Sequence, residues 1–252
     1  MPKKIKLPLV IAITILLVCA LIYALALIAF NGGIKGAIQN LKPPINPYGK
    51  QAITQRATAR QNIYKTFAEI NDLKLFTEYA TSSHDRCHKG KSSWKRTDAY
   101  SNTCVYKITK FYGFNEDFKE TMFSFEDGLV NLGWKYLPHT DKYPMESLME
   151  YYDKNHGAKL INSEGTYYVS NLPSSIATYL KVGQTLEINL AEKATHDLKS
   201  FEYTQKETSG TAGVEVTYEE KDLKDVYEVF EGITKQNQFV IAISIQTTYI
   251  KE

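Results

Sequence analysis

The chain has 252 residues, which is enough for a membrane anchor followed by one folded domain of about 200 residues. Its formal net charge of +2 is unevenly distributed, because residues 1–50 carry six lysines and no acidic side chain. The other residues hold 24 basic and 28 acidic side chains, and this balance argues against the basic face of a nucleic-acid-binding domain. We therefore expect no nucleic-acid partner.

The most distinctive stretch is Leu7–Phe30, a largely apolar run of 24 residues without a charged side chain, broken only by Pro8, Thr14 and Tyr23. A helix of this length spans about 36 Å and exceeds the ~30 Å hydrocarbon core of a bilayer. A cleaved signal peptide is the alternative, with a weak cleavage site around Ala24 and Ala26. The apolar part of a signal peptide is only about 7–15 residues long, however. The sequence therefore predicts an uncleaved signal-anchor, with the lipid bilayer as its partner.

The orientation of the anchor is predicted from lysines and cysteines together. Three lysines precede the run and three follow it, so the positive-inside rule favours a cytoplasmic amino terminus only weakly. Besides Cys19 within the run, the chain has only Cys87 and Cys104, 17 positions apart in a polar stretch. A disulfide between them suits an oxidising compartment. We therefore expect a single-pass cell-membrane protein with a cytoplasmic tail, residues 1–6, and an extracytoplasmic carboxyl-terminal domain.

The segment after the anchor, residues 31–50, contains four glycines and three prolines. Such a composition disfavours regular structure, so we expect a spacer that lifts the domain off the bilayer. The domain itself is expected to occupy residues 51–252.

Several elements of this domain are predicted by its apolar periodicity. We expect a helix over about residues 53–79, a polar loop over 81–103 and a strand over 104–112. The clearest helix covers residues 115–133, with Asn115 as its N-cap and Gly133 at its end.

The rest of the chain is expected to be mostly β, with two short helices. We predict short strands or helices over residues 134–136, 144–155, 185–190, 201–206, 214–218, 222–231 and 239–250, of which 144–155 and 222–231 are helical. Alternation in the strands fits antiparallel pairing with one solvated side. The predicted fold class is therefore α+β, with an antiparallel sheet and two or more packed helices.

Two sequence patterns suggest chemistry, but neither predicts a site. His84, Cys87 and His88 have ligand side chains, but we expect Cys87 to pair with Cys104 and therefore no metal. Ser92-Ser93-Trp94-Lys95 resembles the S-x-x-K motif of penicillin-binding proteins, whose serine opens a buried helix. Here the motif lies in a polar segment, so we predict no catalytic residue and no cofactor.

Tyrosine is frequent, with 18 copies, and it occurs in the pairs Tyr151/Tyr152 and Tyr167/Tyr168. Exposed aromatic side chains form binding surfaces for proteins and sugars. We therefore treat these four tyrosines as a candidate binding surface, although adjacent strand residues usually bury one ring of each pair.

The functional expectation is a non-enzymatic, membrane-anchored interaction domain that binds another envelope protein or a polysaccharide. Two alternatives remain open at this point. One is an envelope hydrolase or transferase whose site is assembled from scattered residues. The other is a structural subunit of a secretion or surface assembly, because its layout resembles that of single-span subunits of secretion machines.

Overall fold

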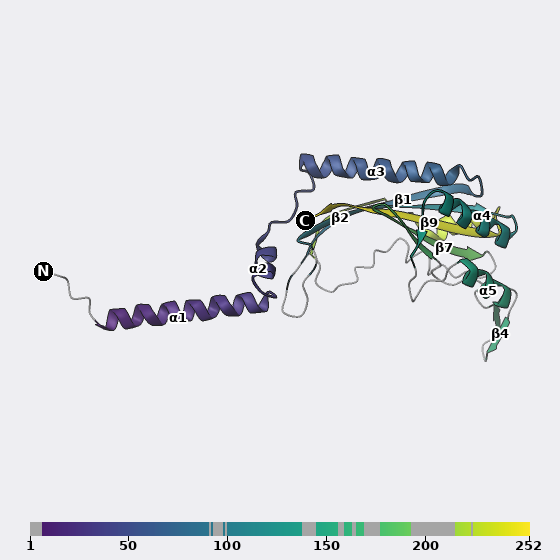
Figure 1. Cartoon of the computed structure of the whole chain (residues 1–252). Coiled ribbons are helices and arrows are strands. Elements are labelled where there is room, and N and C mark those ends of the chain that lie inside the picture. The colour runs from purple at the N-terminus through teal and green to yellow at the C-terminus, as the bar shows by residue number, and fades with distance from the viewer. Residues whose placement is uncertain are drawn as a thin grey trace.

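The computed structural model describes residues 7–90, 92, 98, 100–137, 145–155, 159–162, 165–168, 177–192, 215–222 and 224–252. A long apolar helix leads through a short helix into a domain in which helices pack on a twisted antiparallel sheet (Figure 1). The predicted α+β class and the antiparallel sheet are confirmed.

Helix α1 (Leu7–Phe30) has the bounds expected from the sequence. It is long and apolar enough to cross a membrane, and none of its most apolar window is buried within the protein. Gly32 and Gly33 follow it with φ values of 76° and 93°, a region of backbone space that favours glycine, and they end the helix.

The segment expected to be an irregular spacer contains a helix. Helix α2 (Ile34–Leu41) follows the two glycines, and helix α3 (Lys50–Asn71) begins after the prolines. The prolines that discouraged a helical prediction all lie at residues 43–47, beyond the end of α2. Apart from the short turn at residues 31–33, only residues 42–49 have the expected irregular conformation.

The main sheet has seven antiparallel strands within the described residues, in the order β3-β6-β7-β9-β2-β1-β8. A separate hairpin pairs β4 with β5. The strands are β1 (Thr77–Lys89), β2 (Asn102–Phe114), β3 (Lys135–Tyr136), β4 (Lys159–Asn162), β5 (Gly165–Tyr168), β6 (Ala177–Lys181), β7 (Gln184–Glu192), β8 (Glu215–Asp222) and β9 (Phe239–Lys251).

Helices cover both faces of the sheet. Helix α3 crosses one face, and α4 (Phe118–Asn131) and α5 (Met145–Asn155) contribute to the same core (Figure 1). Helix α7 (Val226–Thr234) packs through Phe230 and Ile233 on the other face. Strand β9 is therefore buried on both sides from Phe239 to Ile245, rather than solvated on one side as expected.

The alternation of β9 explains how one strand serves two cores. Phe239, Ile241, Ile243 and Ile245 point into the core beneath α3, whereas Val240 and Ala242 belong to the core beneath α7. Successive side chains on a strand point to opposite faces, so a nearly continuous apolar run is what a doubly covered strand requires.

Strand β1 is the main difference from the expected fold. Helix α3 ends at Asn71 rather than near residue 79, and residues 77–89 form a strand instead of the start of a polar loop. Strand β1 lies between β2 and β8, where its polar side chains find partners. Asp85, for example, is buried against an arginine of α3.

The caps of two helices also differ in detail. Asp117, rather than Asn115, caps α4 by accepting a hydrogen bond from the Glu120 amide at 2.9 Å. Asp225 caps α7 in the same way by accepting from the Glu228 amide at 3.0 Å. Both fit the preference for aspartate at this position. The strand expected over residues 201–206 lies outside the described residues.

Two phenylalanines on α4 test the placement of the core. We expect Phe125→Ala, which removes a fully buried ring packed edge-on against Phe76 at 5.0 Å, to lower the free energy of unfolding by about 3–5 kcal/mol. Phe123→Ala, two residues away but 42% exposed, should cost less than about 1 kcal/mol. Urea unfolding of the full chain in detergent, followed by tryptophan fluorescence, measures both. Equal losses would contradict the assignment of these faces.

Candidate functional site

The cysteine of β1 and its two histidines point to opposite faces of the sheet. Cys87 lies directly opposite Cys104 in the β1–β2 pair, and their sulfur atoms are bonded at 2.00 Å. His84 and His88 alternate with Cys87, so they lie on the other face and about 13 Å apart along the strand. The described residues hold no group of three side chains that could bind a metal ion.

His84 is a buried side chain whose contact is with β8. Its Nε2 atom lies 2.9 Å from Oε1 of Glu219, and this hydrogen bond lowers the pKa of the Glu219 carboxyl. The histidine therefore links two neighbouring strands, a structural use of the residue.

A buried polar network joins α3 to the sheet beside the disulfide. Arg56 forms an ion pair with Asp85, whose side chain is 2% exposed. The Tyr249 hydroxyl donates to Asp85 at 2.7 Å and lies 3.5 Å from the Cys87 sulfur. The Arg56 guanidinium also lies 4.6 Å from the ring centre of Tyr218. Arg56 on α3 is thus the cation at which residues of β1, β8 and β9 come together.

Burial governs the titration of this network. Burial raises the pKa of the Asp85 carboxyl, and the hydrogen bond from Tyr249 and the charge of Arg56 offset that effect only in part. Burial also raises the pKa of the Tyr249 hydroxyl, and the hydrogen bond with Asp85 raises it further. Each charged member of the network, Arg56 and Asp85, therefore has its partner inside the protein.

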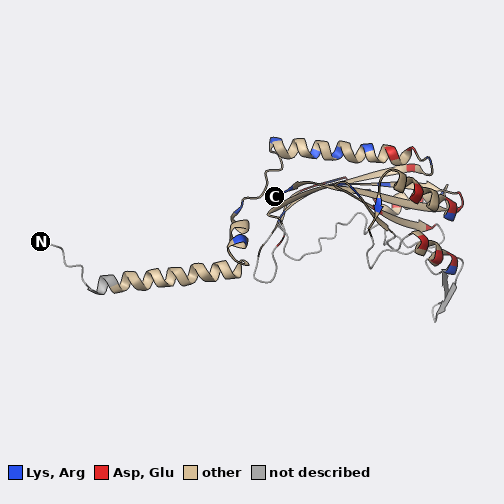
Figure 2. Ribbon diagram, in the orientation of Figure 1, with Lys and Arg blue, Asp and Glu red and all other residues tan. Residues whose placement is uncertain are grey.

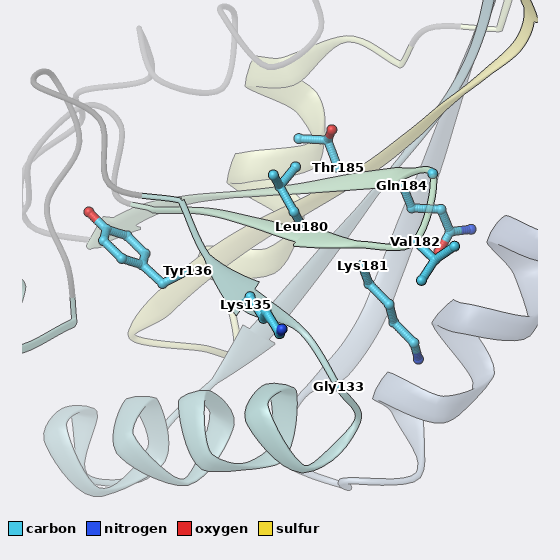
Figure 3. A pocket seen from close by; sticks show the side chains of 9 residues that line it. Gly133, Lys135, Tyr136, Leu180, Lys181, Val182, Gln184 and Thr185 are labelled. Atoms are coloured by element: carbon cyan, nitrogen blue, oxygen red, sulfur yellow. The ribbon is translucent and has the colours of Figure 1, made fainter.

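A hollow of about 490 Å³ lies at the edge of the sheet, between the end of α4, strand β3 and the β6–β7 turn. Figure 3 shows the lining side chains. They are Gly133, Lys135, Tyr136, Leu180, Lys181, Val182, Gly183, Gln184 and Thr185. The turn positions this rim through Gly183, which has a φ of 75° and whose carbonyl accepts from Thr247 at 2.8 Å.

The rim of the hollow is apolar and basic. Leu180 is 40% exposed, and Val182, at the tip of the turn, is fully exposed at 101%. The Lys181 ammonium contacts Glu69 at 3.0 Å and lies 5.9 Å from the Trp134 ring centre, whereas Lys135 is exposed. Figure 3 shows Lys135 between the hairpin and the end of α4. The arrangement suits the binding of a group that is both apolar and anionic.

Of the four tyrosines expected to form a binding surface, Tyr151 and Tyr152 do not line this hollow. Tyr151 and Tyr152 lie on α5 and are half-buried. Tyr152 stacks on Phe118 at 4.4 Å between ring centres, a contact with the core. Tyr167 and Tyr168 lie on β5, but their side chains are outside the described residues. Their role in binding stays a prediction.

The sequence alone does not predict the lining of the hollow, because its residues come from two distant stretches, 133–136 and 180–185. One local signal was present: Gly183, since glycine is a residue that favours turns. Ser92 of the S-x-x-K pattern lies elsewhere, hydrogen-bonded to the Asn31 carbonyl at 2.7 Å. Lys95 is outside the described residues.

Comparison with protein-family models, with curated proteins and with solved structures finds no match to this chain. A functional proposal for this chain therefore rests on the geometry of its own residues.

Two arginines on α3 test the polar network. We expect Arg56→Gln to lower the free energy of unfolding at pH 7 by about 3 kcal/mol, because it leaves Asp85 buried without its cation. Arg60→Gln, one turn later and over the exposed ring of Tyr64, should cost less than about 1 kcal/mol.

The loss caused by Arg56→Gln should also depend on pH. Burial raises the pKa of the Asp85 carboxyl even beside Arg56, and loss of the arginine should raise it further. The penalty should therefore grow as pH rises through the pKa of Asp85 in the unmodified chain, and it should level off above the pKa of Asp85 in the variant. Urea unfolding at several pH values measures this difference. A loss independent of pH would show that Asp85 is not the group left unpaired.

Proposed function

We propose that this chain is a non-enzymatic interaction protein, held at the cell membrane by α1, whose extracytoplasmic domain binds another envelope protein. The observation that carries the proposal is the hollow at the β6–β7 turn, with apolar Leu180 and Val182 beside Lys135 and Lys181. Protein interfaces are typically built around apolar anchors surrounded by polar and charged groups.

The compartment is supported by the cysteine pair. Both sulfur atoms are buried, and the bond joins two central strands of the sheet. Disulfides of this kind persist in oxidising compartments and are rare in the cytosol. An anchor at the amino terminus, together with a domain folded outside, gives the layout that an envelope receptor or adaptor requires.

Exposed Lys135 indicates the charge of the partner, because Lys181 is already paired with Glu69. An acidic segment with apolar side chains would complement the basic, apolar rim, because opposite charges steer and select partners. A polysaccharide is the alternative ligand, and it would use Tyr136, whose ring also lines the hollow. A second copy of the chain would make the protein a structural subunit of an assembly.

Site-specific photocrosslinking in cells that express the full chain tests this proposal. A photoreactive residue in place of Val182 should give a protein adduct, whereas one in place of Val216, 43% exposed on β8, should not. Lys135→Glu should reduce the Val182 adduct several-fold, and Lys221→Glu on β8 should leave it unchanged.

The mass of the adduct separates the candidates. An adduct containing a different protein supports the proposal, and one of twice the chain's own mass supports the structural subunit. Equal adducts at Val182 and Val216, or no dependence on Lys135, would contradict a binding role for the hollow.

A further inference from the structure

Helix α2 has two chemically different sides. At about 100° per residue, Ile34, Ile38 and Leu41 fall on one side of the helix, and Gly36, Gln39 and Asn40 fall on the other. The three apolar side chains are 65%, 55% and 83% exposed. These three side chains form an exposed apolar stripe that has no partner among the described residues. The stripe faces away from the side of α2 that holds Gly36, Gln39 and Asn40.

The polar side of α2 is fixed to the folded domain. The Gln39 amide donates to the Asp98 and Tyr100 carbonyls, both at 3.2 Å. The Asn40 amide group donates to the Ser92 carbonyl at 2.7 Å, and its oxygen accepts from the Ser92 backbone amide at 2.9 Å. The connection between β1 and β2 thus holds α2 in one rotation, with the apolar stripe directed outward.

Gly36 brings α2 into close contact with this connection. A β carbon at this position would lie 1.8 Å from the Asn31 carbonyl oxygen and 2.2 Å from the Ser92 hydroxyl oxygen. Any larger residue would push the helix away from both. The rotation of α2, and hence the direction of its stripe, follows from this packing.

The stripe also lies close to the end of α1. Only Asn31, Gly32 and Gly33 separate α1 from α2, so α2 begins within about 14 Å of the end of the apolar run. Figure 1 shows α2 running crosswise to α1, with the domain on its far side. If α1 crosses a bilayer, α2 lies along the surface of that bilayer.

Charge fits the same location. Lys35 lies on α2 and Lys42 directly after it, and both are exposed. Figure 2 shows further basic residues along the near part of α3, whereas acidic residues gather on α4 and α5 at the opposite end of the domain. Lysines beside a membrane are attracted to anionic headgroups, and amphipathic helices with a basic polar side bind at the headgroup boundary.

We propose that α2 is an interfacial membrane helix that inserts Ile34, Ile38 and Leu41 into the bilayer surface next to α1. Because its polar side is bonded to the domain, this contact sets the orientation of the whole sheet above the membrane. The inference rests on the proposed crossing of the membrane by α1.

Environment-sensitive fluorescence of the full chain tests the inference. The chain, with Cys19→Ala, is reconstituted into phosphatidylcholine/phosphatidylglycerol vesicles and labelled at one new cysteine, Ile38→Cys or Leu41→Cys. We expect the label to emit at shorter wavelength and to be quenched by brominated acyl chains. Aqueous iodide should quench its emission several-fold less than that of a control label. The control is Val130→Cys on α4, 58% exposed like Ile38 but far from α2 in Figure 1.

Three results would overturn the inference, and they have different meanings. Labels at residues 38 and 41 that behave like the label at 130 would show that α2 lies in water. Blue-shifted labels that brominated lipid does not quench would show that protein, such as a second copy, covers the stripe. A label at Ile22→Cys that brominated lipid fails to quench would show that α1 itself is outside the bilayer, which would overturn the proposed anchor as well.

Discussion

The structure depends on the burial of one stripe of α3 against the sheet. Ile63, Phe67 and Ile70 are at most 2% exposed and lie in the same core as the central strands β2 and β9. Burial of side chains of this size is the main favourable contribution to folding. Because α3 follows α1 and α2 in the chain, the same packing fixes the end of the domain at which α1 and α2 join it.

Polar contacts at the two ends of α3 fix the position of the helix on the sheet. At the near end of α3, Arg56 meets Asp85 beside the disulfide, and at its far end the Asn71 side chain accepts from the Tyr112 hydroxyl at 2.9 Å. Between them, Lys110 of β2 reaches Glu78 at 2.6 Å. Polar groups that leave water require partners, so the two contacts of α3 favour a single register of helix on sheet, whereas Lys110 and Glu78 join β2 to β1. A domain held in this way can transmit the orientation of α2 to the proposed binding surface at its edge.

Much of this architecture could be predicted from local sequence. The charge-free run of α1, the pairing of Cys87 with Cys104 and the alternation of β9 each carry a signal within a few residues. Strand β1 had no such signal, because its polar side chains are accommodated by contacts with α3 and β8 that only the tertiary structure supplies. Helix α2 was not predicted, because the neighbouring prolines indicate irregular structure. The hollow could not be predicted, because β3 and the β6–β7 turn come together only across the sheet edge.

The central claim is that α1 crosses the membrane and leaves the domain outside, and thiol labelling in intact cells tests it most directly. In a chain with Cys19→Ala, Val182→Cys places a thiol at the fully exposed turn, and Lys3→Cys places one in the amino-terminal tail. The disulfide keeps Cys87 and Cys104 unreactive. A membrane-impermeant maleimide should label position 182 in intact cells and position 3 only after lysis. Labelling of position 182 only after lysis would contradict the account.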